Sequence, residues 1–245
     1  MAEISVEQML EMFEVDLDGE GVQNAFLYPV HPFRLLACGK SSSGKSTAIS
    51  LALVNHKIKF DKLYLYARHL HQDKKYMGLI KHLKSIVKSI NETSKYELEL
   101  NDILHVASTY EEMLPVDDLD PDCRNLVWFD DFLQDKNANI LALDYFIRGR
   151  HMNASIIYCT QGYFAKQLPV NIRNNCNYFM LCKNIAQNNT LDRIARDLGH
   201  DPKEFLEKFE IATKDDNHSF VLVDTIHSNP DYQIRKNWDM VFQPN

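Results

Sequence analysis

The sequence predicts an α/β fold in which a mainly parallel sheet is covered by helices on both faces. Strand-like apolar stretches alternate with helix-like stretches along the 245 residues, with about seven strands in all. A glycine-rich loop joins the first of these strands to a helix, and two carboxylates end a strand farther along the chain. Because neither a second core nor an internal repeat is visible, we expect one such domain over residues 31–228.

A peripheral segment is expected before this domain and a tail after it. Residues 1–30 carry a helical apolar pattern at 6–13, followed by an acidic link that contains glycine. Residues 229–245 contain Tyr232, Trp238 and Phe242, so we expect this tail to pack on the domain.

The expected strands are short apolar runs bounded by polar or turn residues. They lie at 33–38, 63–67, 103–107, 125–130, 155–161, 177–182 and 218–225. Apolar residues at spacings of three and four predict helices at 47–56, 74–90, 139–150, 189–198 and 202–209. Asp201 is expected to cap the last of these helices, and 110–114 to form a helical turn.

The glycine-rich loop at 39–46 matches the pattern G-x-x-x-x-G-K-[ST] at every fixed position. The strand before it and the helix after it supply the context that this phosphate-binding motif needs, which disfavours a chance match in a serine-rich loop. Glycines let the backbone approach phosphates, and main-chain N–H groups at the helix start face the anion. We expect Lys45 to reach the β- and γ-phosphates and Ser46 to ligate Mg²⁺. The residues expected to contact the nucleotide are Gly39, Lys40, Ser41, Ser42, Ser43, Gly44, Lys45, Ser46 and Thr47.

Two carboxylates, Asp130 and Asp131, follow the apolar strand at 125–130. The carboxyl ends of parallel strands are where α/β sites lie, so Asp130 is expected to hold Mg²⁺ directly or through water. Asp131 occupies the position where many ATPases keep a glutamate as the base that polarises the attacking water. An acidic turn after a strand is common by itself, but the glycine loop upstream favours the functional interpretation.

The strand at 155–161 also ends in polar side chains. Gln161 is the better candidate for a residue that senses the γ-phosphate or orients the attacking water, and Thr160 is the alternative. The alternative to a functional role is that both residues simply cap the next segment.

Composition limits the class of protein. A hydrophobic content of 45% and a charged content of 25% are ordinary for a soluble globular protein. No membrane span is expected, because no apolar run reaches about 18 residues. The acidic first 20 residues do not resemble a secretory signal, and five cysteines without a CxxC pair suggest reduced thiols.

Charge is distributed unevenly around a net charge of −7. Residues 57–95 contain ten Lys/Arg and three Asp/Glu, whereas residues 97–135 contain twelve Asp/Glu and one Arg. The basic block suits a face that binds an anion, and the acidic block suits a face that binds a cation or a neighbouring subunit. The alternative is that both blocks are solvated surfaces. We expect the basic segment 74–95 to touch DNA phosphates, with Lys81, Lys84 and Lys88 as its test residues.

Four features in this order resemble the genome-packaging ATPases of large double-stranded DNA viruses and of virophages, a branch of the FtsK–HerA superfamily. They are the glycine loop, the Asp130-Asp131 strand, Arg150-His151, and the Thr160-Gln161 strand followed by Ile172-Arg173-Asn174. The resemblance covers roughly residues 30–200, and the chain length is similar to that of the compact virophage members.

The resemblance implies a RecA-like, ASCE-type P-loop NTPase fold and hydrolysis of ATP with Mg²⁺. It further implies a homo-oligomeric ring that drives double-stranded DNA into a preformed capsid and docks on a capsid or vertex protein. The implied location is the viral factory in the host cytoplasm, with possible association with the virion and no secretion. Lys45, Ser46, Asp130 and Gln161 match the family positions, whereas Asp131 departs from the usual glutamate.

In such rings one subunit lends an arginine to the γ-phosphate site of the next. Arg150 and Arg173 are the candidates for this role, with Arg148 behind them. A planar guanidinium stabilises the oxygens of the transition state and raises the rate by about 10³–10⁵ in other NTPases.

Two other functions fit parts of the sequence. A nucleoside or nucleotide kinase shares the glycine loop, but it needs an arginine-bearing lid and an acceptor pocket, and the Asp130 and Gln161 strands suit hydrolysis better. A non-catalytic structural module gated by ATP is the other alternative.

Overall fold

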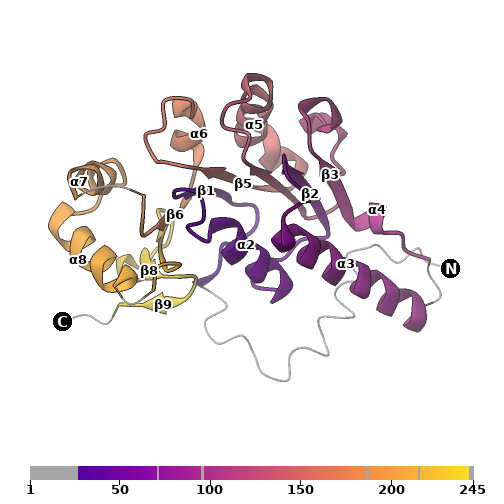
Figure 1. The fold of residues 1–245 in the computed structure, drawn as a ribbon, viewed down its shortest axis with the longest axis horizontal. Helices are drawn as coiled ribbons and strands as arrows, with labels where there is room; N and C mark the ends of the chain where they lie inside the picture. The colour runs from indigo at the N-terminus through magenta and orange to yellow at the C-terminus, as the bar shows by residue number, and fades with distance from the viewer. Residues whose placement is uncertain (1–26, 71, 95–96, 186–187, 215, 243–245) are drawn as a thin grey trace.

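The structure is a computed structural model that describes residues 27–70, 72–94, 97–185, 188–214 and 216–242. The expected helix at 6–13 lies outside these residues. The described residues form one nine-stranded sheet with the strand order β3-β2-β4-β5-β1-β6-β7-β8-β9 (Figure 1). The strands are β1 (Arg34–Cys38), β2 (Lys62–Ala67), β3 (Leu104–Ala107), β4 (Asn125–Asp130), β5 (Ala154–Thr160), β6 (Tyr178–Cys182), β7 (Phe220–Asp224), β8 (Ile234–Lys236) and β9 (Met240–Val241).

The strands from β3 to β6 in this order are parallel, and β7, β8 and β9 add to the sheet in antiparallel fashion. The prediction of a mainly parallel sheet is therefore confirmed. The parallel strands all end at one edge of the sheet. Since β7 is antiparallel to β6, it begins at that same edge, and β8 ends there.

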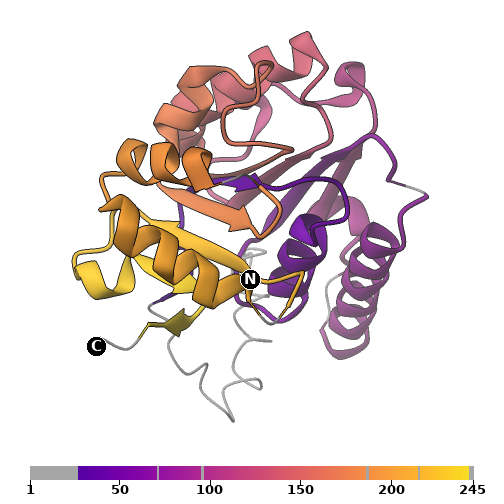
Figure 2. The ribbon, with the colours of Figure 1, turned by 60° about the vertical axis from the view of Figure 1, so that its left-hand side comes forward.

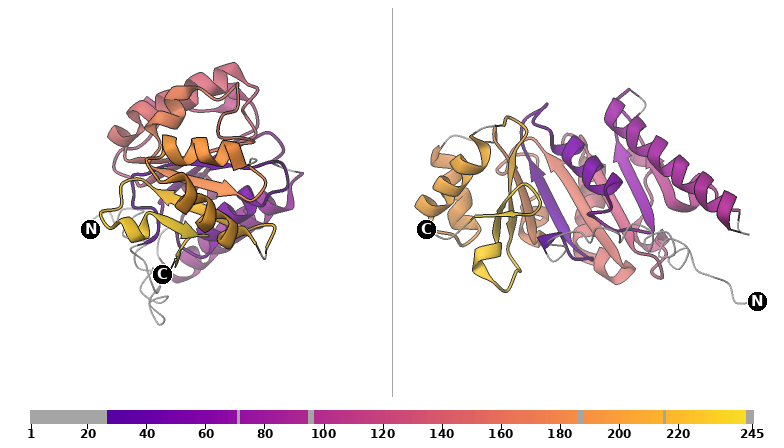
Figure 3. Two further views of the ribbon diagram at one scale, coloured as in Figure 1. Left: turned by 90° about the vertical axis from the view of Figure 1, so that its left-hand side faces the viewer. Right: turned by 90° about the horizontal axis from the view of Figure 1, so that it is seen from below.

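Helices cover both faces, as predicted. Figure 1 shows α5 and α6 above the sheet and α2 and α3 below it, and the view from below in Figure 3 places α2 and α3 across the strands. Figure 2 shows α8 beside β7 and β8 at one end of the sheet. The helices are α2 (Lys45–Val54), α3 (Lys74–Thr93), α4 (Leu100–Ile103), α5 (Lys136–Arg148), α6 (Val170–Asn175), α7 (Asn188–Asp197) and α8 (Pro202–Thr213). A 3-10 turn at Tyr110–Glu112 stands where the helical turn was expected.

Side-chain caps set several of these helix starts. The Asp73 side chain accepts a hydrogen bond from the Lys75 N–H and begins α3 at the predicted residue. Asp135 accepts one from the Ala138 N–H, so α5 begins three residues earlier than expected. Asp201 caps α8 as predicted, through the N–H groups of Lys203 and Glu204.

The core lies on both faces of the central strands. In β4, Trp128 packs on the side of α2 and α3, and Phe129 packs on the side of α5. Every residue of β4 is buried, which is why the strand reads as a continuous apolar run rather than an alternating one. At the far end, β8 joins the sheet by pairing with β7, where Arg235 is fully buried against Asp224.

Candidate functional site

The phosphate loop lies between the end of β1 and the start of α2. Gly44 has φ of 89° and Ser42 has φ of 63°, so the loop depends on left-handed backbone at two positions. A Cβ on Gly39 would lie 2.5 Å from Ser43 Oγ and 2.7 Å from Cys182 Cβ, so only glycine fits there. The Lys45 ammonium donates hydrogen bonds to the carbonyl oxygens of Gly39 (2.5 Å) and Lys40 (3.1 Å) and thus lies across the loop.

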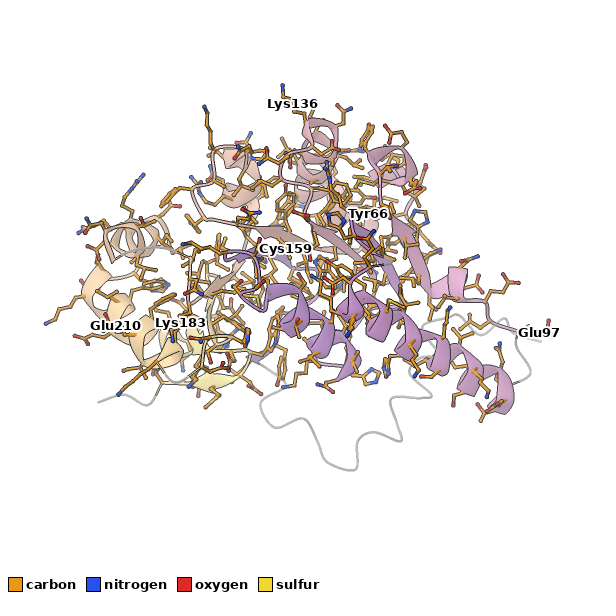
Figure 4. All side chains as sticks on the ribbon, viewed as in Figure 1. Tyr66, Glu97, Lys136, Cys159, Lys183 and Glu210 are labelled. Carbon is orange, nitrogen blue, oxygen red and sulfur yellow. The ribbon has the colours of Figure 1, made fainter. Side chains whose placement is uncertain are left out.

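A cavity of about 390 Å³ opens beside this loop and is walled by the ends of β4 and β5 and the start of α3. Cys159, labelled near the middle of Figure 4, lines it where β5 ends. The cavity brings together the predicted residues Lys45, Ser46, Asp130, Asp131 and Gln161. It also contains residues to which the sequence analysis gave no part in the nucleotide site, namely Arg68, His69, Asp73, Lys75 and Tyr76.

The Ser46 hydroxyl donates a hydrogen bond to Oδ2 of Asp130. Asp130 is only 7% exposed, so this carboxylate is largely shielded from water. No cluster of three or more His, Cys, Asp or Glu side chains suited to a metal occurs among the described residues. A hydroxyl and one carboxylate are hard oxygen donors that suit Mg²⁺, which usually completes its coordination with phosphate oxygens and water. The residues present therefore fit a Mg²⁺ ion held together with a nucleotide.

Tyr76 is a further partner of the same carboxylate. Its hydroxyl donates a hydrogen bond to Oδ2 of Asp130 from the first turn of α3. Burial raises the pKa of the Tyr76 phenol, and the charge of Asp130 raises this pKa further, so the hydroxyl stays protonated and acts as a donor. The Tyr76 ring packs edge-on against Trp128 in β4, with centroids 5.6 Å apart.

Lys75 lies beside this pair. Its ammonium is 3.0 Å from Asp73 Oδ2 and 3.8 Å from Asp130 Oδ2. Lys75 belongs to the basic segment 74–95 that was expected to touch DNA phosphates, but its side chain, in the first turn of α3, lines the cavity. Partial burial acts to raise the pKa of Asp73, but hydrogen bonds from Lys75 outweigh it and hold that pKa below its usual value.

Asp131 and Gln161 face the cavity from neighbouring strand ends. Asp131 has φ of 63° immediately after β4, a conformation that aspartate tolerates better than most residues. Its carboxylate is 3.8 Å from His69 Nε2, and both side chains are well exposed. The Thr160 side chain is buried and its hydroxyl donates to the Gly162 carbonyl, whereas Gln161 is exposed at the cavity.

The sequence from residue 26 to residue 238 matches the family described as poxvirus A32 protein. The chain belongs to this family. Among solved structures it is similar to the genome packaging NTPase B204 of Sulfolobus turreted icosahedral virus 2 in complex with AMPPCP, at 14% identity and a TM-score of 0.51, over 86% of this chain and 100% of that chain. The same NTPase in complex with AMP matches at 14% identity and a TM-score of 0.50, with the same coverage. At this identity the likeness concerns the fold. No curated protein matches the sequence.

These findings confirm the predicted P-loop NTPase fold and the predicted relationship to viral packaging ATPases. The A32-family chain is therefore a nucleotide-binding P-loop ATPase. None of the helices within the described ranges is both long and apolar enough to cross a membrane.

The three candidate arginines of this A32-family ATPase lie away from the cavity of their own subunit. Arg150 lies in the 3-10 turn Gly149–Met152, directly before β5, so about 20 Å of strand separates it from Gln161. In α6, the Arg173 Nε atom is 3.3 Å from Asp197 Oδ2, and the guanidinium lies against the rings of Tyr163 and Phe164. Arg148 is bound by two carboxylates, those of Asp117 and Asp144.

Proposed function

We propose that this protein is an ATP-driven motor that translocates double-stranded DNA and packages it into a preformed viral capsid. The observation that carries the proposal is the single cavity in which the phosphate loop, the Ser46–Asp130 pair and Gln161 meet, in a chain of the A32 family. A loop for the phosphates opposite a carboxylate and a polar strand tip is the arrangement that NTP hydrolysis needs.

In this mechanism the loop N–H groups and Lys45 hold the β- and γ-phosphates of ATP. Ser46 and Asp130 would hold Mg²⁺, which would supply positive charge beside the phosphate oxygens when bound. Gln161 orients the attacking water, and the exposed carboxylate of Asp131 accepts its proton. Tyr76 and Ser46 fix the orientation of the Asp130 carboxylate before the nucleotide arrives.

A neighbouring subunit completes the site in a homo-oligomeric ring. Arg150 is the best candidate for the arginine that acts across the interface. It is exposed and forms no ion pair with another described residue, whereas Arg148 and Arg173 are held by carboxylates of their own subunit. Its planar charge stabilises the transition-state oxygens of the neighbour's nucleotide.

The ring grips the DNA backbone rather than the bases. Lys81, Lys84 and Lys88 are exposed along one side of α3 and offer charge for phosphates without a base-reading element. The motor docks on a capsid or vertex protein in the viral factory of the host cytoplasm, and family membership supports this location.

The test is the ATPase rate with and without duplex DNA, with Lys45→Ala as the inactive control. We expect turnover that rises with DNA and is lost in the control. A rate that is indifferent to DNA contradicts translocation. Transfer of phosphate to a nucleoside would indicate a kinase, and binding of ATP without turnover would indicate a structural module.

Mixing two inactive variants tests the role of Arg150. Lys45→Ala lacks its own phosphate site but still supplies Arg150, and Arg150→Ala has the reverse defect. We expect the mixture to regain part of the activity, because some interfaces then combine an intact loop with an intact arginine. Inactive mixtures, or an active Arg150→Ala protein, contradict this role.

A further inference from the structure

A groove of about 620 Å³ lies beside β3, the strand that ends the sheet next to α3 and α4 (Figure 1). Met77 and Ile80 line it from α3, Leu100 from α4, and Leu104 and Val106 from β3. Met77 is 56% exposed and Val106 is 38% exposed, so this apolar lining is open to solvent. Apolar side chains that gather in one groove, rather than lying singly on a surface, mark a place where another segment binds. We call this site the β3 groove.

Gly78 also lines the β3 groove, in the second turn of α3. A glycine inside a helix makes it less stable than alanine does, by about 1 kcal/mol. A Cβ on Gly78 would meet no atom within 4 Å among the described residues, so their packing does not require a glycine here. A missing side chain instead lets a second backbone approach α3 closely.

The rim of the β3 groove is basic. Lys74, Lys81 and Lys84 line it and are exposed, and none of the described residues that line it is acidic. A segment with an apolar side flanked by carboxylates would therefore match the groove in both hydrophobicity and charge.

The first 26 residues of the chain have this pattern. They contain seven Asp/Glu and no Lys/Arg. On a helix the apolar residues at 6–13 would share one side, and carboxylates at spacings of three and four would flank it. The apolar residues are Val6, Met9, Leu10 and Phe13, and the carboxylates are Glu3, Glu7, Glu11 and Glu14.

We infer that the β3 groove binds residues 3–14 of its own chain, with their apolar side on Met77 and Val106 and their carboxylates beside the basic rim. This docking does not depend on the nucleotide site or on the proposed motor function. Lys81 and Lys84 are also proposed to contact DNA, so the docked segment and DNA exclude each other at these two lysines.

The segment can reach the groove within one chain. Tyr28, at the start of the described residues, belongs to the same core cluster as Leu70 and Leu104, which line the groove, so all three lie on one face of the sheet. Four strand spacings separate β1 from β3, which amounts to about 19 Å. Residues 14–26 span up to about 40 Å when extended, which is enough to connect the two places.

The experiment measures how fast hydroxyl radicals oxidise Met77 in the full chain, by mass spectrometry and under conditions that oxidise each molecule at most once. Met240 is the internal reference, because it is 54% exposed and lies outside the groove. A tethered segment at an effective concentration of about 1 mM, with a dissociation constant of about 0.1 mM, leaves the groove open about one-tenth of the time. We therefore expect Met77 to react about tenfold more slowly than Met240.

Two variants should each raise the oxidation rate of Met77 to that of the reference. Leu10→Asp with Phe13→Asp removes the apolar side of the segment and changes no described residue. Lys81→Glu with Lys84→Glu reverses the charge of the rim at two exposed positions of α3.

Exchanging the charges tests the pairing itself. Adding Glu7→Lys and Glu11→Lys to the rim variant should restore protection of the groove, because opposite charges then face each other again. Lys166→Glu with Lys203→Glu is the matched control and should leave protection unchanged, since both lysines are exposed and neither lines the groove.

Equal oxidation of Met77 and Met240 in the wild type overturns the inference, and so does protection that survives the changes at Leu10 and Phe13. Protection that appears only at higher protein concentration assigns the groove to a neighbouring copy and also overturns binding within one chain. None of these results depends on ATP or DNA, so the proposed function stands or falls separately.

Discussion

Replacing Tyr76 by phenylalanine removes one hydroxyl from the corner of the cavity that holds Asp130. The ring can keep its edge-on contact with Trp128, so the packing of α3 on β4 is retained. Asp130 keeps its hydrogen bond from Ser46 and loses the one from Tyr76. Its carboxylate is then free to turn away from the orientation that a metal ion requires.

The expected size of the effect depends on the buried geometry. A hydrogen bond to a charged acceptor contributes about 1.5–3 kcal/mol. Tyr76 is 3% exposed and Asp130 is 7% exposed, so water does not readily replace the missing donor. Removal of a partner that orients a metal ligand typically weakens metal affinity or activity by about 10–100-fold, and about 1.4 kcal/mol corresponds to tenfold.

The assay is ATP turnover as a function of Mg²⁺ concentration, together with ATP binding in the absence of divalent cations. We expect the Mg²⁺ dependence of Tyr76→Phe to shift to about 10–100-fold higher concentration. ATP binding without metal should be unchanged, because the Tyr76 hydroxyl lies at Asp130 and Ser46, the proposed metal ligands, rather than at Lys45.

Tyr145→Phe is the matched control. Its hydroxyl donates to the Leu114 carbonyl at 2.9 Å from α5, on the opposite face of the sheet. Both variants lose one buried hydroxyl, but only Tyr76→Phe should alter the Mg²⁺ dependence. An unchanged Mg²⁺ dependence in Tyr76→Phe, or an equal shift in both variants, refutes the reasoning.

Three further predictions concern DNA binding, pH and stability. Replacing Lys81, Lys84 and Lys88 together by glutamine should flatten the dependence of DNA affinity on salt, measured by titration at several salt concentrations. The slope of log affinity against log salt concentration falls by about 0.9 for each phosphate that is no longer neutralised. Burial lowers the pKa of His31, whose ring nitrogens bond an amide oxygen and a seryl hydroxyl. The contribution of His31 to stability is therefore complete above its unfolded pKa and is lost as pH falls through its lower folded pKa. The free energy of unfolding of His31→Gln, measured against pH, should lack this loss on the acid side. Asp224→Asn should lower the free energy of unfolding by about 3–5 kcal/mol in urea, because it leaves a fully buried arginine without its charge partner.

Each of these has a clear contrary result. A salt slope equal to that of the wild type removes α3 as a phosphate-binding surface. If His31→Gln shows the same acid-side loss of stability as the wild type, another group causes that loss. An Asp224→Asn protein within about 1 kcal/mol of the wild type would mean that the buried charge finds other partners or water.

The seven strands predicted from apolar runs all exist within a few residues of their expected bounds, because a buried parallel strand carries its pattern locally. The two strands that were missed, β8 and β9, have three and two residues. Segments this short show no periodicity. β8 becomes a strand through pairing with β7, where Arg235 meets Asp224, and β9 becomes a strand through pairing with β8. Neither partner is visible from the local sequence.

The residues of the candidate site could also be predicted only in part. The loop at 39–46 is contiguous, so its conformation could be predicted from the sequence. Tyr76 and Lys75 could not, because their role depends on the pairing of β2 with β4, which places Ala67 opposite Asp130 and brings the start of α3 to the cavity. Helical periodicity describes which side of α3 is buried, but it does not say what lies beside its first turn.

The strand order explains why some predicted residues meet and others do not. In a parallel sheet, residues that come after a strand lie at its carboxyl edge, and residues that precede it lie at the opposite edge. The carboxyl ends of β1, β2, β4 and β5 build the cavity, and they contribute the phosphate loop, Arg68, Asp130 with Asp131, and Gln161. Arg150 precedes β5 and so lies at the other edge of its own subunit, which fits its proposed role at the nucleotide of a neighbouring subunit. Because β5 separates β1 from β4, Gln161 enters the cavity between the loop and the carboxylates, which is where the proposed mechanism places the water that attacks the γ-phosphate.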